Sequence, residues 1–199
     1  PNQLHFYSFE TLKEVDEVMQ GDPETLEAYY KEHMDCLACY SWQEAAELFD
    51  QVKNTVIPYP KSNTGLKLRC ISKSSLRKGL QVFYEDENEK IGYTARIWPY
   101  GEINAYEGYE KYQDREVVYQ WHIPELNTEC SIYKAVDAWD YSLYIGFIYL
   151  ENHHMTFTID RMRDESIDGF YEVSHAEVDL NKLKDFEFRT VREILDSMA

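Results

Sequence analysis

Cys36 and Cys39 form a Cys-x-x-Cys motif, and thiols at this spacing can carry out redox chemistry or bind zinc. A redox motif stands at a helix N-terminus directly after a strand, whereas this one follows one expected helix and precedes another. A zinc site needs two further ligands; His33 is near, but Cys70 and Cys130 are single and distant. We therefore interpret the cysteines as reduced structural thiols, with metal binding and redox chemistry as alternatives, and expect no metal and no cofactor.

The adjacent pair His153 and His154, with Glu151 and Asp160, could serve as a metal or acid–base site. Neighbouring residues of a strand point to opposite faces of the sheet, so both imidazoles cannot easily bind one ion. A hairpin tip weakens this objection, but the favoured interpretation is a solvent-exposed turn. Two further histidines, in expected strands, are interpreted as half-buried residues with hydrogen-bond partners: His122 and His175.

The first fifty residues predict a short edge strand followed by three helices. Apolar residues recur every three to four positions, and each run begins at a capping signal. Ser8 and Asp22 are expected N-caps, and Ser41 with Glu44 matches a capping box. The buried stripe of the third helix is expected to include Trp42. The strand is expected at 4–7, and the helices are expected to start near 8, 22 and 41.

The rest of the chain predicts a connector, then strands, then one helix. Residues 54–65 contain Pro58, Pro60 and Gly65, which indicate a connector and the best candidate for a boundary. Further on, apolar and polar residues alternate between polar turns, as in strands, and Thr190 is expected to cap a closing helix. The expected strands are 66–71, 80–84, 91–98, 103–109, 116–123, 141–150, 155–159 and 170–178, with turns at 85–88 and 99–102; residues 127–139 fit either a helix or a strand.

This segregation of helices from strands favours an α+β fold over alternating β-α-β units. The expected architecture is N-terminal helices packed on a mostly antiparallel, meandering sheet, with a closing C-terminal helix. We expect a single domain over 1–199, with a helical part at about 8–53, a sheet part at about 66–188 and the C-terminal helix at about 190–199.

The charge of the 199-residue chain is large and unevenly spread, at −17 overall. Residues 1–50 carry a net −10, residues 51–100 a net +5, and each of the last two quarters a net −6. A basic island runs from Lys53 to Lys78, and no acidic residue occurs between Asp50 and Glu85. The island could neutralise the acidic helices, leave them as a negative face that steers a positive partner, or itself bind phosphate.

Tyrosines and tryptophans are frequent between Tyr93 and Trp121. In single-strand nucleic-acid-binding proteins such aromatics are interleaved with Lys and Arg. Here they are interleaved with glutamates, which argues against nucleic acid and suits a protein interface, where Tyr and Trp are favoured anchors. The alternative is that about half of these aromatics fill the core.

These observations favour an acidic protein-binding inhibitor located in the cytoplasm. It would be a nucleic-acid mimic, such as a phage or plasmid anti-restriction or anti-CRISPR protein, or a toxin immunity protein. The expected partner is a basic protein surface, on a nucleic-acid-binding enzyme or nuclease toxin, and not nucleic acid or membrane. The alternatives are a small hydrolase that uses clustered carboxylates with His153, His154 or His175, and an oligomeric structural or assembly protein. The residues expected to contact the partner are Glu10, Glu14, Glu17, Glu24, Glu27, Glu102, Tyr106, Glu107, Tyr109 and Glu110.

Overall fold

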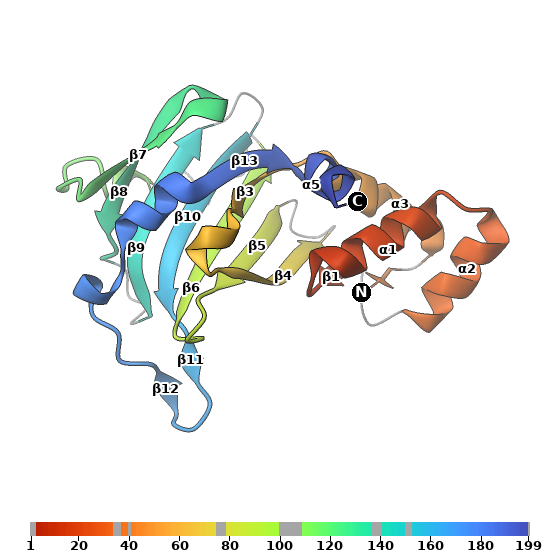
Figure 1. The fold of residues 1–199 in the computed structure, drawn as a ribbon, viewed down its shortest axis with the longest axis horizontal. Helices are drawn as coiled ribbons and strands as arrows, with labels where there is room; N and C mark the ends of the chain where they lie inside the picture. The colour runs from red at the N-terminus through yellow and green to blue at the C-terminus, as the bar shows by residue number, and fades with distance from the viewer. Residues whose placement is uncertain are drawn as a thin grey trace. The chain divides into compact units, whose positions relative to one another are not determined.

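The fold is a mixed α+β fold with a large antiparallel sheet (Figure 1). The computed structural model describes residues 3–33, 37–39, 41–74, 79–99, 109–136, 141–149 and 153–198. It divides into two compact units. We call Pro1–Ile57, Leu68–Val82 and Arg189–Ala199 the helical unit, and Pro58–Lys67 and Phe83–Phe188 the sheet unit. In the part of the chain covered by these ranges, no helix is long and apolar enough to cross a membrane.

The helical unit contains a small antiparallel arrangement in which β1 (Gln3–Phe6) pairs with β2 (Leu37–Ala38) on one side and β4 (Lys67–Ser74) on the other. The expectation that residues 4–7 form an edge strand was therefore wrong. Leu4 lies opposite both Leu37 and Lys73 and is fully buried. A two-residue strand such as β2 has no hydrophobic period, so the sequence pattern could not reveal the second neighbour of β1.

The helices of this unit are α1 (Phe9–Met19), α2 (Pro23–Glu32), α3 (Trp42–Lys53) and α5 (Val191–Ser197). Each begins at its predicted cap, which confirms those predictions. A side-chain oxygen of the cap accepts a hydrogen bond from a backbone N–H that has no partner within the helix. The pairs are Ser8 with Thr11 at 3.1 Å, Asp22 with Thr25 at 2.8 Å, Ser41 with Glu44 at 3.2 Å, and Thr190 with Glu193 at 3.1 Å.

The core of the helical unit forms where α1 and α3 contact β1 and α5. Phe6 of β1 and Phe49 of α3 meet edge to face, with their ring centroids 5.7 Å apart. Leu12 and Val52 are fully buried, as their helical spacing predicts, whereas Trp42 is only partly buried. The apolar stripes therefore position the charged faces of α1 and α3 towards solvent.

The sheet unit is built on five antiparallel strands in the order β6 (Ile91–Pro99), β10 (His153–Arg161), β9 (Ser142–Tyr149), β8 (Thr128–Lys134) and β7 (Tyr119–Ile123) (Figure 1). Most of the segment for which helix and strand were both open is therefore a strand, β8. β5 (Leu80–Glu85) also matches its prediction, although the division between the units falls within it. The predicted turn 99–102 and strand 103–109 fall mostly in residues 100–108, outside the described residues.

Two further sequence predictions need correction. The expected connector 54–65 contains β3 (Val56–Pro60), which pairs with β13 (Phe186–Thr190), and a 3-10 turn at Ser62–Thr64. Prolines are tolerated here because this is a two-stranded pair, in which one edge of each strand needs no ladder partner. The expected strand 170–178 was also wrong: only Gly169–Phe170 is extended, as β12 beside β11 (Arg163–Asp164), and a Ser174–Glu177 capping box starts a 3-10 turn at His175.

Aromatic side chains fill the core of the sheet unit. β13 and the preceding 3-10 helix η4 (Leu180–Asp185) run along one face of the sheet (Figure 1). Trp121, which is 1% exposed, packs there against Phe157, Phe186 and Phe188, with ring centroids 5.0 to 5.8 Å apart. On the other face, a second cluster of buried rings covers part of β8 and β9: Tyr112, Tyr133 and Phe147. Filling the core therefore accounts for several of the aromatics that the sequence pattern had assigned to an interface.

Candidate functional site

A row of three exposed glutamates follows one side of α1. Glu10, Glu14 and Glu17 are spaced i, i+4 and i+7, which brings them to one face of a helix. Tyr29 of α2 donates a hydrogen bond from its hydroxyl to Oε1 of Glu14 at 3.2 Å. We call these three residues the α1 acidic row. It contains three of the ten residues predicted to contact a partner.

Two other predicted glutamates are exposed but do not extend this row. Glu24 and Glu27 lie roughly 140–160° away from Tyr29 around the axis of α2, at about 100° per residue. They therefore face away from the side of α2 that contacts Glu14. Glu27 also pairs with Lys31 at 3.4 Å on the surface. The structure thus brings together the glutamates of α1, but not those of α2 with them.

The described lysines and arginines of the basic island are distributed over both units and form no ion pair with the α1 acidic row, while Arg77 and Lys78 lie outside the described residues. Lys53 binds Asp16 at 2.9 Å in a partly buried ion pair and lies over the Phe49 ring. Lys61 pairs with Glu187 in the sheet unit at 3.8 Å. Lys13 flanks the row on α1, but among the described residues no glutamate of the row forms an ion pair within 4.0 Å. The three carboxylates are therefore exposed negative charge without a direct cationic partner in this part of the chain.

Two of the five predicted contact residues of the aromatic region lie in the described part of the chain, Tyr109 and Glu110. Glu102, Tyr106 and Glu107 lie outside the described residues. Glu110 is exposed, whereas Tyr109 is half-buried against Phe147 and Tyr149, with ring centroids 5.4 and 5.5 Å apart. Tyr109 thus packs within the sheet unit, which weakens its assignment as an exposed interface anchor.

The candidate catalytic histidines do not gather in one place. His175 contacts the Leu143 carbonyl through Nε2 at 3.0 Å. His122, which was expected to be half-buried, lies on the surface instead, with Nδ1 3.7 Å from Oε1 of Glu129. His153 and His154 begin β10, with His153 half-buried and His154 buried, so the solvent-exposed turn expected at this pair was wrong. Burial together with the neighbouring His154 lowers the pKa of His153. Across the described ranges, no group of three or more His, Cys, Asp and Glu side chains is placed to hold a metal ion.

Two of the cysteines are buried. Burial raises the pKa of the Cys39 thiol to about 11 and that of Cys130 to about 12. Both thiols are therefore protonated near neutral pH, which disfavours them as nucleophiles or metal ligands. Cys36, the other half of the Cys-x-x-Cys motif, lies outside the described residues.

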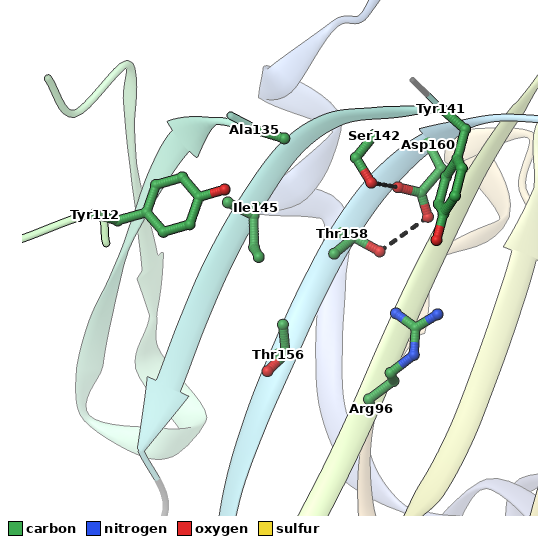
Figure 2. A pocket seen from close by; sticks show the side chains of 9 residues that line it. All are labelled: Arg96, Tyr112, Ala135, Tyr141, Ser142, Ile145, Thr156, Thr158 and Asp160. Atoms are coloured by element: carbon green, nitrogen blue, oxygen red, sulfur yellow. Dashed lines mark hydrogen bonds between the residues drawn. The ribbon is translucent and has the colours of Figure 1, made fainter. Parts of the chain in front are cut away.

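A polar pocket opens on the sheet unit, beside the cluster of buried rings formed by Tyr112, Tyr133 and Phe147. A bulge between β9 and β10 shifts their register, so that Asp160 lies opposite Ser142 while Ile159 lies opposite Tyr144. The pocket has a volume of about 200 Å³. It is lined by Arg96, Tyr112, Ala135, Tyr141, Ser142, Ile145, Thr156, Thr158 and Asp160 (Figure 2).

Asp160 is the most deeply buried charged group of this pocket, at 9% exposure. Ser142 donates a hydrogen bond to its Oδ1 and Thr158 donates one to its Oδ2, both at 3.0 Å (Figure 2). Burial raises the pKa of the Asp160 carboxyl, while these two hydrogen bonds and the charge of Arg96 partly offset that effect. The pocket therefore holds a carboxylate that is oriented by hydroxyls and disfavoured by its burial.

Replacing Asp160 by asparagine is expected to raise the free energy of unfolding near pH 7 by about 1 kcal/mol. When the pH is above the raised pKa of Asp160, the folded state holds an ionised carboxyl in a buried site, which lowers the free energy of unfolding. Below the unfolded pKa of about 3.9 both states are protonated, and that cost is absent. The advantage of Asp160→Asn over wild type should therefore shrink as the pH falls towards 4, measured by urea unfolding across a pH series.

The matched control for this prediction is Asp168→Asn, which removes a fully exposed carboxylate. That variant should follow the wild-type stability at every pH. A constant difference between Asp160→Asn and wild type over the whole pH range would contradict a role for ionisation.

Asp160 appeared in the sequence only as a companion of His153, which lies seven residues away on β10, roughly 23 Å at 3.3 Å per residue. Its actual neighbours, Ser142 and Arg96, belong to other strands, so no local spacing could identify them. The one available signal was polar alternation on β10, where Thr156, Thr158 and Asp160 share a face.

No protein-family model, curated protein or solved structure matches this chain.

Proposed function

We propose that this protein binds a positively charged surface of another protein through the α1 acidic row and thereby inhibits that partner. The observation that carries the proposal is the exposure of Glu10, Glu14 and Glu17 without an ion pair among the described residues, while Lys53 is occupied by Asp16. Exposed charge of one sign accelerates encounter with a surface of the opposite sign. Tyr29 adds a half-buried aromatic side chain beside Glu14, and tyrosines are favoured anchors at interfaces.

The partner that best fits this row is a nucleic-acid-binding enzyme or a nuclease toxin. Along α1, successive carboxylates rise by about 4.5–6 Å, while phosphates follow one another at about 3.4 Å per strand along duplex DNA. The two charge spacings are of the same order, so a channel that binds phosphates could accept the row. An anti-restriction, anti-CRISPR or immunity protein of a phage or plasmid would act in this way, without chemistry of its own.

The hydrolase alternative has less support. It requires a carboxylate and a histidine in one pocket, as in general acid–base catalysis. The pocket described above instead combines Asp160 with Arg96 and two hydroxyls, and none of its lining residues is a histidine. The binding proposal therefore remains the better supported of the two.

The test begins with purified partner, obtained by capture on the immobilised protein and identified by mass spectrometry. The triple variant Glu10→Gln, Glu14→Gln, Glu17→Gln is expected to weaken binding to that partner by about 10- to 100-fold. Three charges at roughly 0.5–1 kcal/mol each account for this range. The weaker binding should come mainly from a slower association rate, measured by surface plasmon resonance. Raising the salt concentration should reduce the difference between the triple variant and the wild type.

The matched control removes the same charge from the sheet unit, as Glu125→Gln, Glu165→Gln, Glu172→Gln, at three exposed positions. This control should bind like the wild type. Equal losses in both triple variants would indicate non-specific attraction by net charge and would overturn the assignment to α1. A captured partner whose binding does not depend on salt would do the same.

A further inference from the structure

The pocket of the sheet unit contains two side chains of opposite charge that form no direct ion pair with each other, Arg96 and Asp160. Figure 2 shows the guanidinium of Arg96 reaching from β6 towards the carboxylate of Asp160 on β10. Arg96 acts on Asp160 electrostatically, yet the two groups do not form an ion pair within 4.0 Å. Both groups line the pocket, together with Tyr141, so a bound molecule can contact both.

Each of the two charged groups retains capacity for a ligand. Oδ1 and Oδ2 of Asp160 each accept one hydroxyl, from Ser142 and Thr158, which leaves further lone pairs for donors. A guanidinium has five N–H donors in a fixed fork that matches a carboxylate. A ligand with only one charge would pair with one of these groups and desolvate the other without supplying an opposite charge, which is unfavourable.

The rest of the wall consists of Thr156, two tyrosines and two aliphatic side chains. Ala135, Ile145 and the ring of Tyr112 line the side of the pocket away from Arg96 (Figure 2). The hydroxyl oxygen of Tyr112 accepts a hydrogen bond from the Val136 backbone N–H at 3.1 Å, which fixes this ring. The volume of about 200 Å³ is below the ~300–1,000 Å³ of sites for drug-sized ligands. It therefore fits a small metabolite with one short uncharged side chain.

We propose that this pocket binds a free α-amino acid with an uncharged side chain. Arg96 pairs with the ligand carboxylate, Asp160 accepts hydrogen bonds from the ligand ammonium, and the Tyr112–Ile145 wall contacts the side chain. The zwitterion carries both charges on groups attached to the same Cα atom, so it compensates both protein charges at once. This site lies in the sheet unit and does not involve the α1 acidic row.

The test is titration of the ¹⁵N-labelled full chain with L-leucine, N-acetyl-leucine and leucinamide, followed by NMR chemical shifts. N-acetyl-leucine lacks the ammonium, and leucinamide lacks the carboxylate. Leucine is expected to shift the signals of the pocket residues, and each derivative is expected to bind about 10- to 100-fold more weakly, as for the loss of one charged hydrogen bond. Glucose, which carries hydroxyls but no charge, should leave the spectrum unchanged.

Two variants test which protein group contacts the carboxylate of the ligand and which contacts its ammonium. In Arg96→Gln, leucine and leucinamide should bind equally, because the carboxylate contact is gone; in Asp160→Asn, leucine and N-acetyl-leucine should bind equally. Arg163→Gln removes an exposed arginine outside the pocket and should bind leucine like the wild type. The spectrum of each variant without ligand shows whether it is folded, and either pocket variant alone suffices to decide the proposal.

Three results would overturn the proposal. The first is that leucine at millimolar concentration leaves the pocket signals unchanged. The second is that both derivatives bind as tightly as leucine, which would mean that the two charges are not used together. The third is that Arg96→Gln and Asp160→Asn retain the full wild-type preference for leucine.

Discussion

Replacing Trp121 by alanine is expected to lower the free energy of unfolding by about 3–5 kcal/mol. Trp121 lies on β7 and contacts Phe157 of β10 and Phe186 and Phe188 of β13. Its removal leaves a cavity between the sheet and β13, and the surrounding aromatic rings cannot close it without leaving their own contacts. The loss should appear as a lower urea midpoint, followed by far-ultraviolet circular dichroism.

Two further variants set the scale of this effect. Trp121→Phe keeps an aromatic ring in the site and should lose clearly less stability than alanine, because the residual cavity is smaller. Tyr7→Ala removes an aromatic ring that is 63% exposed and should change the stability by no more than about 0.5 kcal/mol. A loss below about 1 kcal/mol for Trp121→Ala would mean that these rings do not form the core of the sheet unit.

Local signals predicted the elements that depend on local chemistry. The N-caps at Ser8, Asp22, Ser41 and Thr190 were correct because a cap needs only a side-chain oxygen and the backbone three residues later. Polar alternation, which reflects one covered face, also predicted β6, β7, β9 and β10, although it left β8 open between helix and strand. β3 was missed because its two prolines disfavour a strand, and a pairing with β13, over a hundred residues further on, decides its conformation.

The two candidate sites also differ in how far local sequence signals predict them. The α1 acidic row follows from the i, i+4, i+7 spacing of three glutamates, which any helix brings to one side. The pocket could not be predicted, since it depends on the β9–β10 bulge that places Ser142 opposite Asp160 and on the pairing that places β6 beside β10. Register between strands is a tertiary property, and a shift of one residue would turn Asp160 to the other face.

Gly146 provides a direct test of the register between β9 and its other neighbour, β8. It lies in the middle of β9, opposite Ile132 of β8 and Phe157 of β10. A Cβ added to Gly146 would lie 2.6 Å from Cδ1 of Ile132 and 2.8 Å from Sγ of Cys130. Both neighbours are completely or almost completely buried, so neither side chain can move into solvent. Gly146→Ala is therefore expected to lower the free energy of unfolding by about 1–3 kcal/mol through overpacking.

A second substitution should restore part of this loss if the strands pair as described. Ile132→Val removes the Cδ1 atom that the new methyl group meets, and alone it should cost about 0.5–1.5 kcal/mol as a cavity. In Gly146→Ala/Ile132→Val the added methyl fills the space that the removed one leaves, so the double variant should be more stable than the sum of the single effects predicts, by about 1 kcal/mol. Gly169→Ala is the control, because its nearest neighbour is the Ile167 Cδ1 atom at 4.0 Å. Strict additivity of the two effects would mean that Gly146 and Ile132 do not contact each other, and would contradict the described pairing of β8 with β9.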